Sequence, residues 1–235
     1  MTTFDSNGKH ISVELFLPTV GGLHPAIVVA YGTEGMGVIV GYDAGAAIRD
    51  FAGYLATKGF VVLVPHFFER TDTPAGLETV LPVYTRHRDE WLDALGDCLD
   101  YVASRTTDVD KTKIGLFGFS LGGHLALRQS KIGTGIRVRA VVEFFAPISQ
   151  LPFGGLGDHI GNLPPVQIHH GNSDSIVLKT QSDELESLLV AAGKVKGDDY
   201  ERHDYAGEGH GFRGDTAIKT SKQHTFDFFE KHLGK

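Results

Sequence analysis

Apolar stretches alternate with stretches of helical periodicity along most of the chain. Apolar and polar residues alternate over 10–17 up to Pro18, which predicts a half-exposed antiparallel strand near a sheet edge. Nearly continuous apolar runs at 26–31, 60–64 and 138–145 are typical of strands that are covered on both faces, as in a parallel sheet. Helical spacing and shorter apolar runs predict the remaining elements: helices over 43–58, 91–102, 121–127, 178–192 and 216–232, and strands at 114–119, 166–169 and 200–205. This order predicts an α/β protein with one doubly wound, mostly parallel sheet and helices on both faces.

Length and composition narrow the class of protein. The 235 residues, 41% of them hydrophobic, suffice for a single domain spanning 1–235. The net charge of -7 is spread along the chain and the 22 Lys and Arg residues form no basic run, so we expect no nucleic-acid partner. The one cysteine, Cys98, lies on the apolar stripe of its helix and is expected in the core. Residues 1–7 show no signal-peptide pattern and no apolar stretch approaches about 20 residues, so we expect a cytoplasmic protein without a membrane span. We expect the protein to be a monomer or a weak homodimer.

A glycine-rich junction joins the strand at 114–119 to the helix that follows it. Its sequence is Gly-Phe-Ser-Leu-Gly, with Ser120 between Gly118 and Gly122. A side chain at either glycine would crowd a sharp strand-to-helix turn, and such a turn presents the serine hydroxyl at the edge of the sheet. The pattern in this context predicts a nucleophile elbow.

A serine nucleophile needs a general base, and the base needs an acidic partner that fixes its tautomer. In the order Ser, Asp, His that is typical of α/β hydrolases, Asp174 follows the strand at 166–169 and His210 follows the strand at 200–205. We therefore predict a catalytic triad of Ser120, Asp174 and His210. Three rival bases lie within a strand or before Asp174, where the carboxylate is not expected to reach back to them: His203, His169 and His170.

Acyl transfer also needs two N–H donors for the developing oxyanion. The N–H of Leu121, directly after the nucleophile, supplies one, and Gly35 in the glycine-rich loop at 32–37 is expected to supply the other. The loops at 66–85 and 153–163 are expected to shape the substrate pocket. No histidine pair has the spacing of a zinc site, so we expect neither a metal nor another cofactor.

Four segments together resemble the dienelactone hydrolase family, whose members are small α/β hydrolases without a large cap domain. They are the loop at 31–35, the elbow at 118–123, the acid loop at 170–177 and the base loop at 209–212. The resemblance covers nearly the whole chain. It implies an α/β-hydrolase fold and the hydrolysis of small esters and lactones.

The chain departs from this family at the nucleophile and at the arginines that bind the carboxylate of the substrate. The family's type enzyme uses a cysteine where this chain has Ser120, so deprotonation of the nucleophile must depend more on His210. The resemblance implies that Glu34 interacts with the nucleophile and that arginines hold the carboxylate of the substrate. The family's arginine four positions after the histidine corresponds to Gly214, which leaves three candidates: Arg213, Arg86 and Arg88.

These residues predict a serine hydrolase that cleaves small carboxylic esters or lactones through an acyl-enzyme. One alternative is transfer of the acyl group to an alcohol or to peroxide on the same triad. A second alternative is a non-catalytic α/β-hydrolase scaffold that binds a small ligand, although such a scaffold would not need Ser, Asp and His together.

Overall fold

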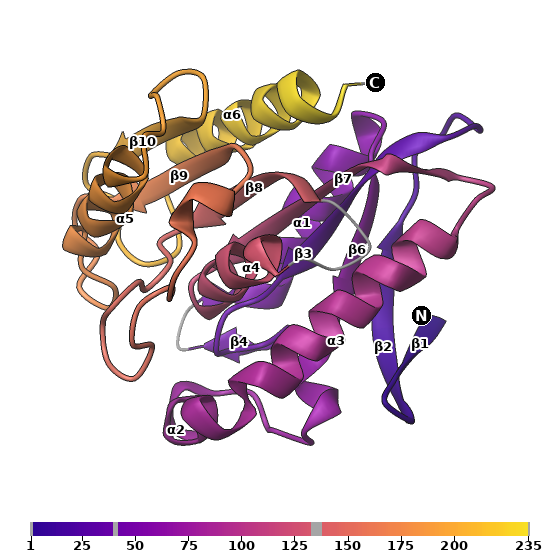
Figure 1. Cartoon of the computed structure of the whole chain (residues 1–235), viewed down its shortest axis with the longest axis horizontal. Coiled ribbons are helices and arrows are strands. Elements are labelled where there is room, and N and C mark those ends of the chain that lie inside the picture. Colours follow the sequence, from indigo (N-terminus) through magenta and orange to yellow (C-terminus); the bar gives the residue numbers. More distant parts are fainter. Residues whose placement is uncertain (1, 40–41, 133–137, 235) are drawn as a thin grey trace.

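A single eight-stranded sheet runs through the computed structural model, which describes residues 2–39, 42–132 and 138–234 (Figure 1). In spatial order its strands are β1 (Thr2–Ser6), β2 (Lys9–Phe16), β6 (Val61–Pro65), β3 (His24–Ala30), β7 (Val109–Phe119), β8 (Val138–Phe144), β9 (Val166–Gly171) and β10 (Tyr200–Tyr205). The pairs β1–β2 and β2–β6 are antiparallel, and the other neighbouring strands are parallel. The short strands β4 (Val38–Ile39) and β5 (Tyr42–Asp43) form a separate antiparallel pair.

Helices cover both faces of the sheet. The helices α3 (Tyr84–Ser104) and α4 (Leu121–Lys131) lie side by side on one face, and α1 (Ala44–Thr57) packs with α6 (Asp215–Leu233) on the other (Figure 1). The helix α5 (Thr180–Ala191) packs against β9. The remaining helical segments are short: η1 (Phe67–Arg70), α2 (Leu77–Val80), η2 (Leu81–Val83) and η3 (Ile160–Asn162). Within the described ranges, no helix is long and apolar enough to cross a membrane.

The central strands are apolar because both of their faces are covered. Ile27, Val28 and Val29 of β3 are fully buried, as are Leu116 and Phe117 of β7. Burial of such side chains contributes about 1.5–3 kcal/mol each relative to an exposed position. The core therefore fixes β3 and β7 next to each other, and with them the loops at their carboxyl ends.

The chain order reverses at β3. Its next strand in sequence within the main sheet, β6, lies on one side, and β7 lies on the other. The loops after β3 and β7 therefore diverge and leave a crevice at the carboxyl edge, where open α/β sheets bind their ligands. Both the glycine-rich loop at 32–37 and the predicted elbow lie at this point.

The predicted α/β architecture is confirmed, and it differs from the structure in short elements and in the bounds of some longer ones, such as α3 and β7. The edge strand β1 and the β4–β5 pair are not among the predicted elements, because two to five residues carry too little periodicity to be recognised. The loop predicted at 66–85 contains η1, α2, η2 and the start of α3. Phe67 and Phe68 anchor its first part, since both rings pack against Tyr31 and Trp91.

Candidate active site

The turn from β7 into α4 carries Ser120 in a strained backbone conformation. Ser120 has φ 53° and ψ -122°, in the region that non-glycine residues rarely occupy. The two flanking glycines are required by close packing. A Cβ at Gly118 would lie 2.2 Å from the carbonyl oxygen of Gly122, and a Cβ at Gly122 would lie 2.1 Å from that of Ala30. Only glycine at both positions allows this elbow to form.

The acid, Asp174, lies on the loop after β9, and its carboxylate is almost fully buried. Its Oδ1 accepts the N–H groups of Ile176 and Val177, both at 2.9 Å. Burial alone would raise the pKa of Asp174. The hydrogen bond and charge of His210, together with those two N–H donors, outweigh burial and hold the pKa below its usual value. Asp174 is therefore an ionised carboxylate that can only accept hydrogen bonds.

The base, His210, lies on the loop after β10 and links the other two residues. Its Nδ1 is 2.8 Å from Oδ2 of Asp174, and its Nε2 is 3.1 Å from Oγ of Ser120. Since the carboxylate can only accept, Nδ1 carries the proton and Nε2 accepts from the serine hydroxyl. The ring also packs on Phe145, with centroids 4.5 Å apart. The structure thus joins the three predicted residues in one hydrogen-bonded chain, the geometry that general-base activation of a serine requires.

The rival histidines are engaged elsewhere. His169 is buried between Tyr205 Oη and Gln167 Oε1, both at 2.8 Å, and burial holds its pKa well below the usual value. The expectation that Asp174 cannot reach back to His170 is wrong, because His170 Nε2 lies 3.6 Å from Oδ2. The Nε2 of His170 also contacts the carbonyl of Val177 at 2.9 Å, and burial lowers the pKa of the ring. His170 therefore supports the acid loop.

An apolar cavity of about 290 Å³ opens above the serine hydroxyl. Its walls come from several elements, and they include Ala44, Ala47 and Ile48 of α1, Leu77 of α2, Phe119, Phe145 and Ile176. Ser120 and His210 line it too, so the reacting groups face a space sized for a small ligand. These apolar walls are not among the predicted site residues, because the sequence pattern of an apolar residue after a strand is the same whether it lines a cavity or fills the core.

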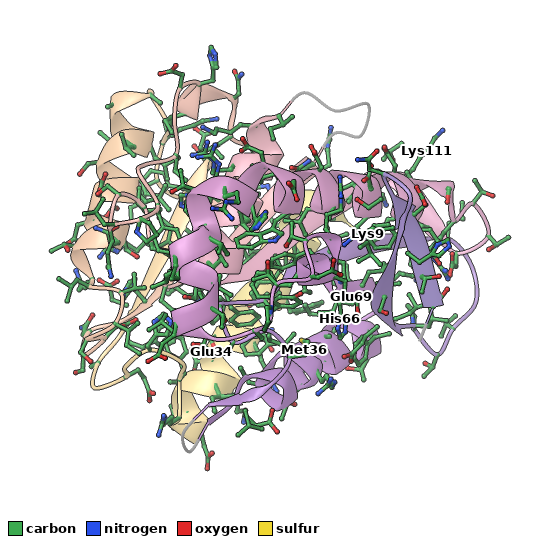
Figure 2. The ribbon with its side chains drawn as sticks, turned by 90° about the horizontal axis from the view of Figure 1, so that it is seen from below. Lys9, Glu34, Met36, His66, Glu69 and Lys111 are labelled. Carbon is green, nitrogen blue, oxygen red and sulfur yellow. The ribbon has the colours of Figure 1, made fainter. Side chains whose placement is uncertain are left out.

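Two charged residues that the family resemblance implies for the site, Glu34 and Arg213, line the same cavity. Thr33 Oγ1 donates to Glu34 Oε2 at 2.7 Å. A Cβ at Gly32 would lie 3.6 Å from that Oε2 and 3.3 Å from Ser120 Cβ, so Gly32 allows the carboxylate to approach the nucleophile. Figure 2, seen from the side on which α2 and β4 lie in Figure 1, labels Glu34 on this loop.

The other two arginines do not line the cavity. Arg86 is exposed near the start of α3, and Arg88 pairs with Asp89 at 2.7 Å. Both lie in the first turns of α3, and the structure does not bring either of them to the cavity at Ser120. Arg213 on the base loop is the predicted arginine that lines the cavity.

The two predicted oxyanion donors differ in their availability. Leu121 is the first residue of α4, and its N–H has no acceptor within the helix. The N–H of Gly35 instead donates to the carbonyl of Gly32 at 3.0 Å, which makes the prediction for Gly35 wrong. Thr33 and Glu34 line the cavity, and their N–H groups meet no backbone carbonyl in the part of the chain that the structure describes.

The residues described contain no group of three or more His, Cys, Asp or Glu side chains that could hold a metal ion. Cys98 is buried in α3, and burial raises the pKa of its thiol. The thiol is therefore a core group, as its position on the apolar stripe predicted.

The mostly parallel sheet and the serine on the turn after its central strand define an α/β hydrolase. Comparison with known proteins specifies the family. The model of the dienelactone hydrolase family matches residues 14–233, so the chain belongs to that family, as the four motif segments predicted.

Individual relatives are distant. Human mitochondrial acyl-coenzyme A thioesterase 2 is 29% identical over 156 residues, which are 66% of this chain and 27% of that protein; the chain thus spans about a quarter of that relative's length. A dienelactone hydrolase-like promiscuous phosphotriesterase from metagenomic libraries has a TM-score of 0.78 at 18% identity, covering 99% of this chain and 97% of its own. A dienelactone hydrolase from Anabaena variabilis has a TM-score of 0.69 at 18% identity, covering 99% of this chain and 96% of its own. The two solved structures show that the fold is shared.

Proposed function

We propose that this hydrolase cleaves small carboxylic esters or lactones through an acyl-enzyme formed on Ser120. The observation that carries the proposal is the hydrogen-bonded chain from Ser120 Oγ to His210 and on to Asp174. This chain lies at the wall of an apolar cavity, from which water is easily displaced by an apolar substrate.

The proposed reaction has two stages. His210 Nε2 takes the proton of Ser120 as Oγ attacks the carbonyl carbon, and Asp174 stabilises the imidazolium that forms. The N–H of Leu121 and an N–H of the loop at 33–34 hold the oxyanion. His210 then protonates the leaving oxygen, and the same imidazole activates the water that releases the acid.

The two charged cavity residues have separate proposed roles. Arg213 stands at the exposed side of the cavity and suits a substrate carboxylate, because a guanidinium can donate two parallel hydrogen bonds. Glu34 lies near the nucleophile, and we infer that it orients the Ser120 hydroxyl or a water beside it. With serine in place of the cysteine of the family's type enzyme, Glu34 is not needed to deprotonate a thiol.

Acyl thioesters are a second candidate substrate class. The observation in their favour is the similarity to acyl-coenzyme A thioesterase 2 over 66% of this chain. The same serine, histidine and oxyanion donors would act on a thioester, in which the leaving atom is sulfur. A thiolate is a better leaving group than an alkoxide, so its departure requires less assistance from His210.

The test compares matched oxygen and sulfur esters. Wild type, Ser120→Ala and the control Ser187→Ala, which removes an exposed hydroxyl on α5, are assayed on p-nitrophenyl acetate, a small lactone and an S-acetyl thioester. We expect Ser120→Ala to lose activity by at least about 10⁴-fold and Ser187→Ala to match wild type. Full activity in Ser120→Ala would refute the proposed nucleophile. Ligand binding by wild type without turnover would favour a non-catalytic scaffold.

A further inference from the structure

A second cavity, of about 270 Å³, adjoins the catalytic one between α1 and α6. Three residues line both cavities: Ala47, Phe119 and Phe145. Ser120 and His210 line only the catalytic cavity. The second cavity is therefore next to the reacting groups but does not contain them.

The walls of the second cavity are mostly aromatic. Besides the two shared phenylalanines, the buried rings of Phe144 and Phe212 and the side chain of Ile218 face it. Within this cluster the Phe119 and Phe144 centroids are 5.2 Å apart, and those of Phe145 and Phe212 are 5.7 Å apart. Such a surface offers no hydrogen bonds and favours an apolar occupant.

A charged pair stands at the side of the second cavity where the two helices meet. Asp50 of α1 lines the cavity and pairs with Lys222 of α6. The Asp50 side chain is 60% exposed, which places this carboxylate at the solvent side, whereas the phenylalanine rings are buried and lie at the inner side. The cavity is thus apolar inside and polar only at its solvent edge.

We propose that this second cavity holds the hydrocarbon chain of the acyl group that is transferred to Ser120. The inference rests on the function proposed above. In that mechanism, His210 must protonate the leaving group and then activate the water, so both must occupy the cavity that His210 lines. The acyl chain exchanges no proton with His210, so it need not stay in the catalytic cavity. It can extend past the small side chain of Ala47, which lines both cavities, toward the aromatic walls of the second cavity.

The size of the cavity sets the chain length that it favours. A water molecule's share of liquid volume is about 30 Å³, so the cavity corresponds to roughly nine waters and accommodates a linear chain of several carbons. Each methylene that is buried there stabilises the transition state by about 0.8 kcal/mol, or roughly fourfold in kcat/KM. We therefore expect kcat/KM to rise from acetyl to longer acyl esters until the cavity is full.

Ile218 offers a test in both directions, because it lines only the second cavity. Ile218→Ala enlarges the cavity and Ile218→Trp fills it. The control is Lys219→Phe, which adds a ring at the exposed neighbouring position of α6 and lines neither cavity. The assay measures kcat/KM on p-nitrophenyl acetate, butyrate, hexanoate and octanoate, and separately on acetate esters of alcohols of increasing length.

The readout is the ratio of octanoate to acetate kcat/KM. We expect Ile218→Trp to lower this ratio by at least about tenfold, Ile218→Ala to raise it, and Lys219→Phe to match wild type. Acetate turnover reports whether each variant is folded. The alcohol series is expected to respond equally in all four proteins. A ratio unmoved by both Ile218 variants, or an effect confined to the alcohol series, would overturn the inference. If the wild-type protein turned over none of these esters, the proposed function itself would be refuted.

Discussion

Glu143 is a buried carboxyl group directly beneath the nucleophile elbow. It lies on β8, opposite Gly118 in the parallel register, and its side chain has no exposed surface. Its Oε2 accepts the N–H of Ala146 at 2.8 Å, whereas its Oε1 meets no hydrogen-bond partner within the described part of the chain. Burial raises the pKa of Glu143 from its ordinary 4.5 to about 8, so the group is protonated at neutral pH.

This raised pKa links the stability of the fold to pH. Between pH 4.5 and about 8 the folded protein keeps the Glu143 proton while the unfolded chain releases it. The stability that the protonated group confers is complete below pH 4.5 and is lost as the pH rises through about 8. At about 1.36 kcal/mol for each pKa unit, the whole loss amounts to about 5 kcal/mol. Glu143→Gln keeps the shape and removes the titration.

Urea unfolding measures the effect, with the fluorescence of Trp91, the single tryptophan and a buried one, as the probe. Between pH 5.5 and 7.5 we expect the unfolding free energy of Glu143→Gln to gain about 2.5 kcal/mol on that of wild type. Glu78→Gln, at an exposed position of α2, controls for the loss of one negative charge. A difference between Glu143→Gln and wild type that stays constant over this range would refute the raised pKa.

Four further substitutions test the site and its scaffold. Asp174→Asn should lower kcat by roughly 10⁴-fold on an ester substrate, because an amide no longer fixes the tautomer of the base; a loss below tenfold would contradict the assigned acid. Gly122→Ala places a Cβ 2.1 Å from a backbone carbonyl oxygen and should destabilise the fold by more than about 4 kcal/mol. The Cβ that Gly53→Ala adds on α1 meets no atom within 4 Å, so this substitution should stabilise the fold by about 0.5–1 kcal/mol in thermal melts. Equal melting temperatures for these two variants would contradict the packing argument. Asp43→Ala removes the side chain that caps α1 and should cost about 1 kcal/mol in urea unfolding, with an unchanged midpoint as the contrary result.

Two kinds of site residue could be predicted from the sequence: those that the geometry of a turn requires, and those that the order of the strands brings together. Gly118 and Gly122 are needed by a turn that only glycine permits, and the sequence pattern records this directly. Asp174 and His210 could be found because parallel strands bring their carboxyl ends to one edge of the sheet. The order of the strands therefore determines which loops meet.

The site features that could not be predicted depend on backbone hydrogen bonds and on the placement of side chains in the fold, neither of which follows from the residue type. Gly35 suits an oxyanion donor by its size, but its N–H is committed to a turn within its own loop. Arg86 and Arg88 lie at the start of α3, and only the packing of that helix in the fold shows that neither side chain lines the cavity. The apolar walls, Phe145 among them, are distinguished from core residues only by the cavity beside them.

The central claim is that Ser120 is the nucleophile and that His210 activates it. The most direct measurement is reaction with a fluorophosphonate probe, followed by intact mass and peptide mapping. We predict a single adduct on Ser120 in wild type, and slower labelling by at least about 10³-fold in His210→Ala. Ester turnover in a protein that forms no adduct, or an adduct on another residue that abolishes activity, would contradict the claim.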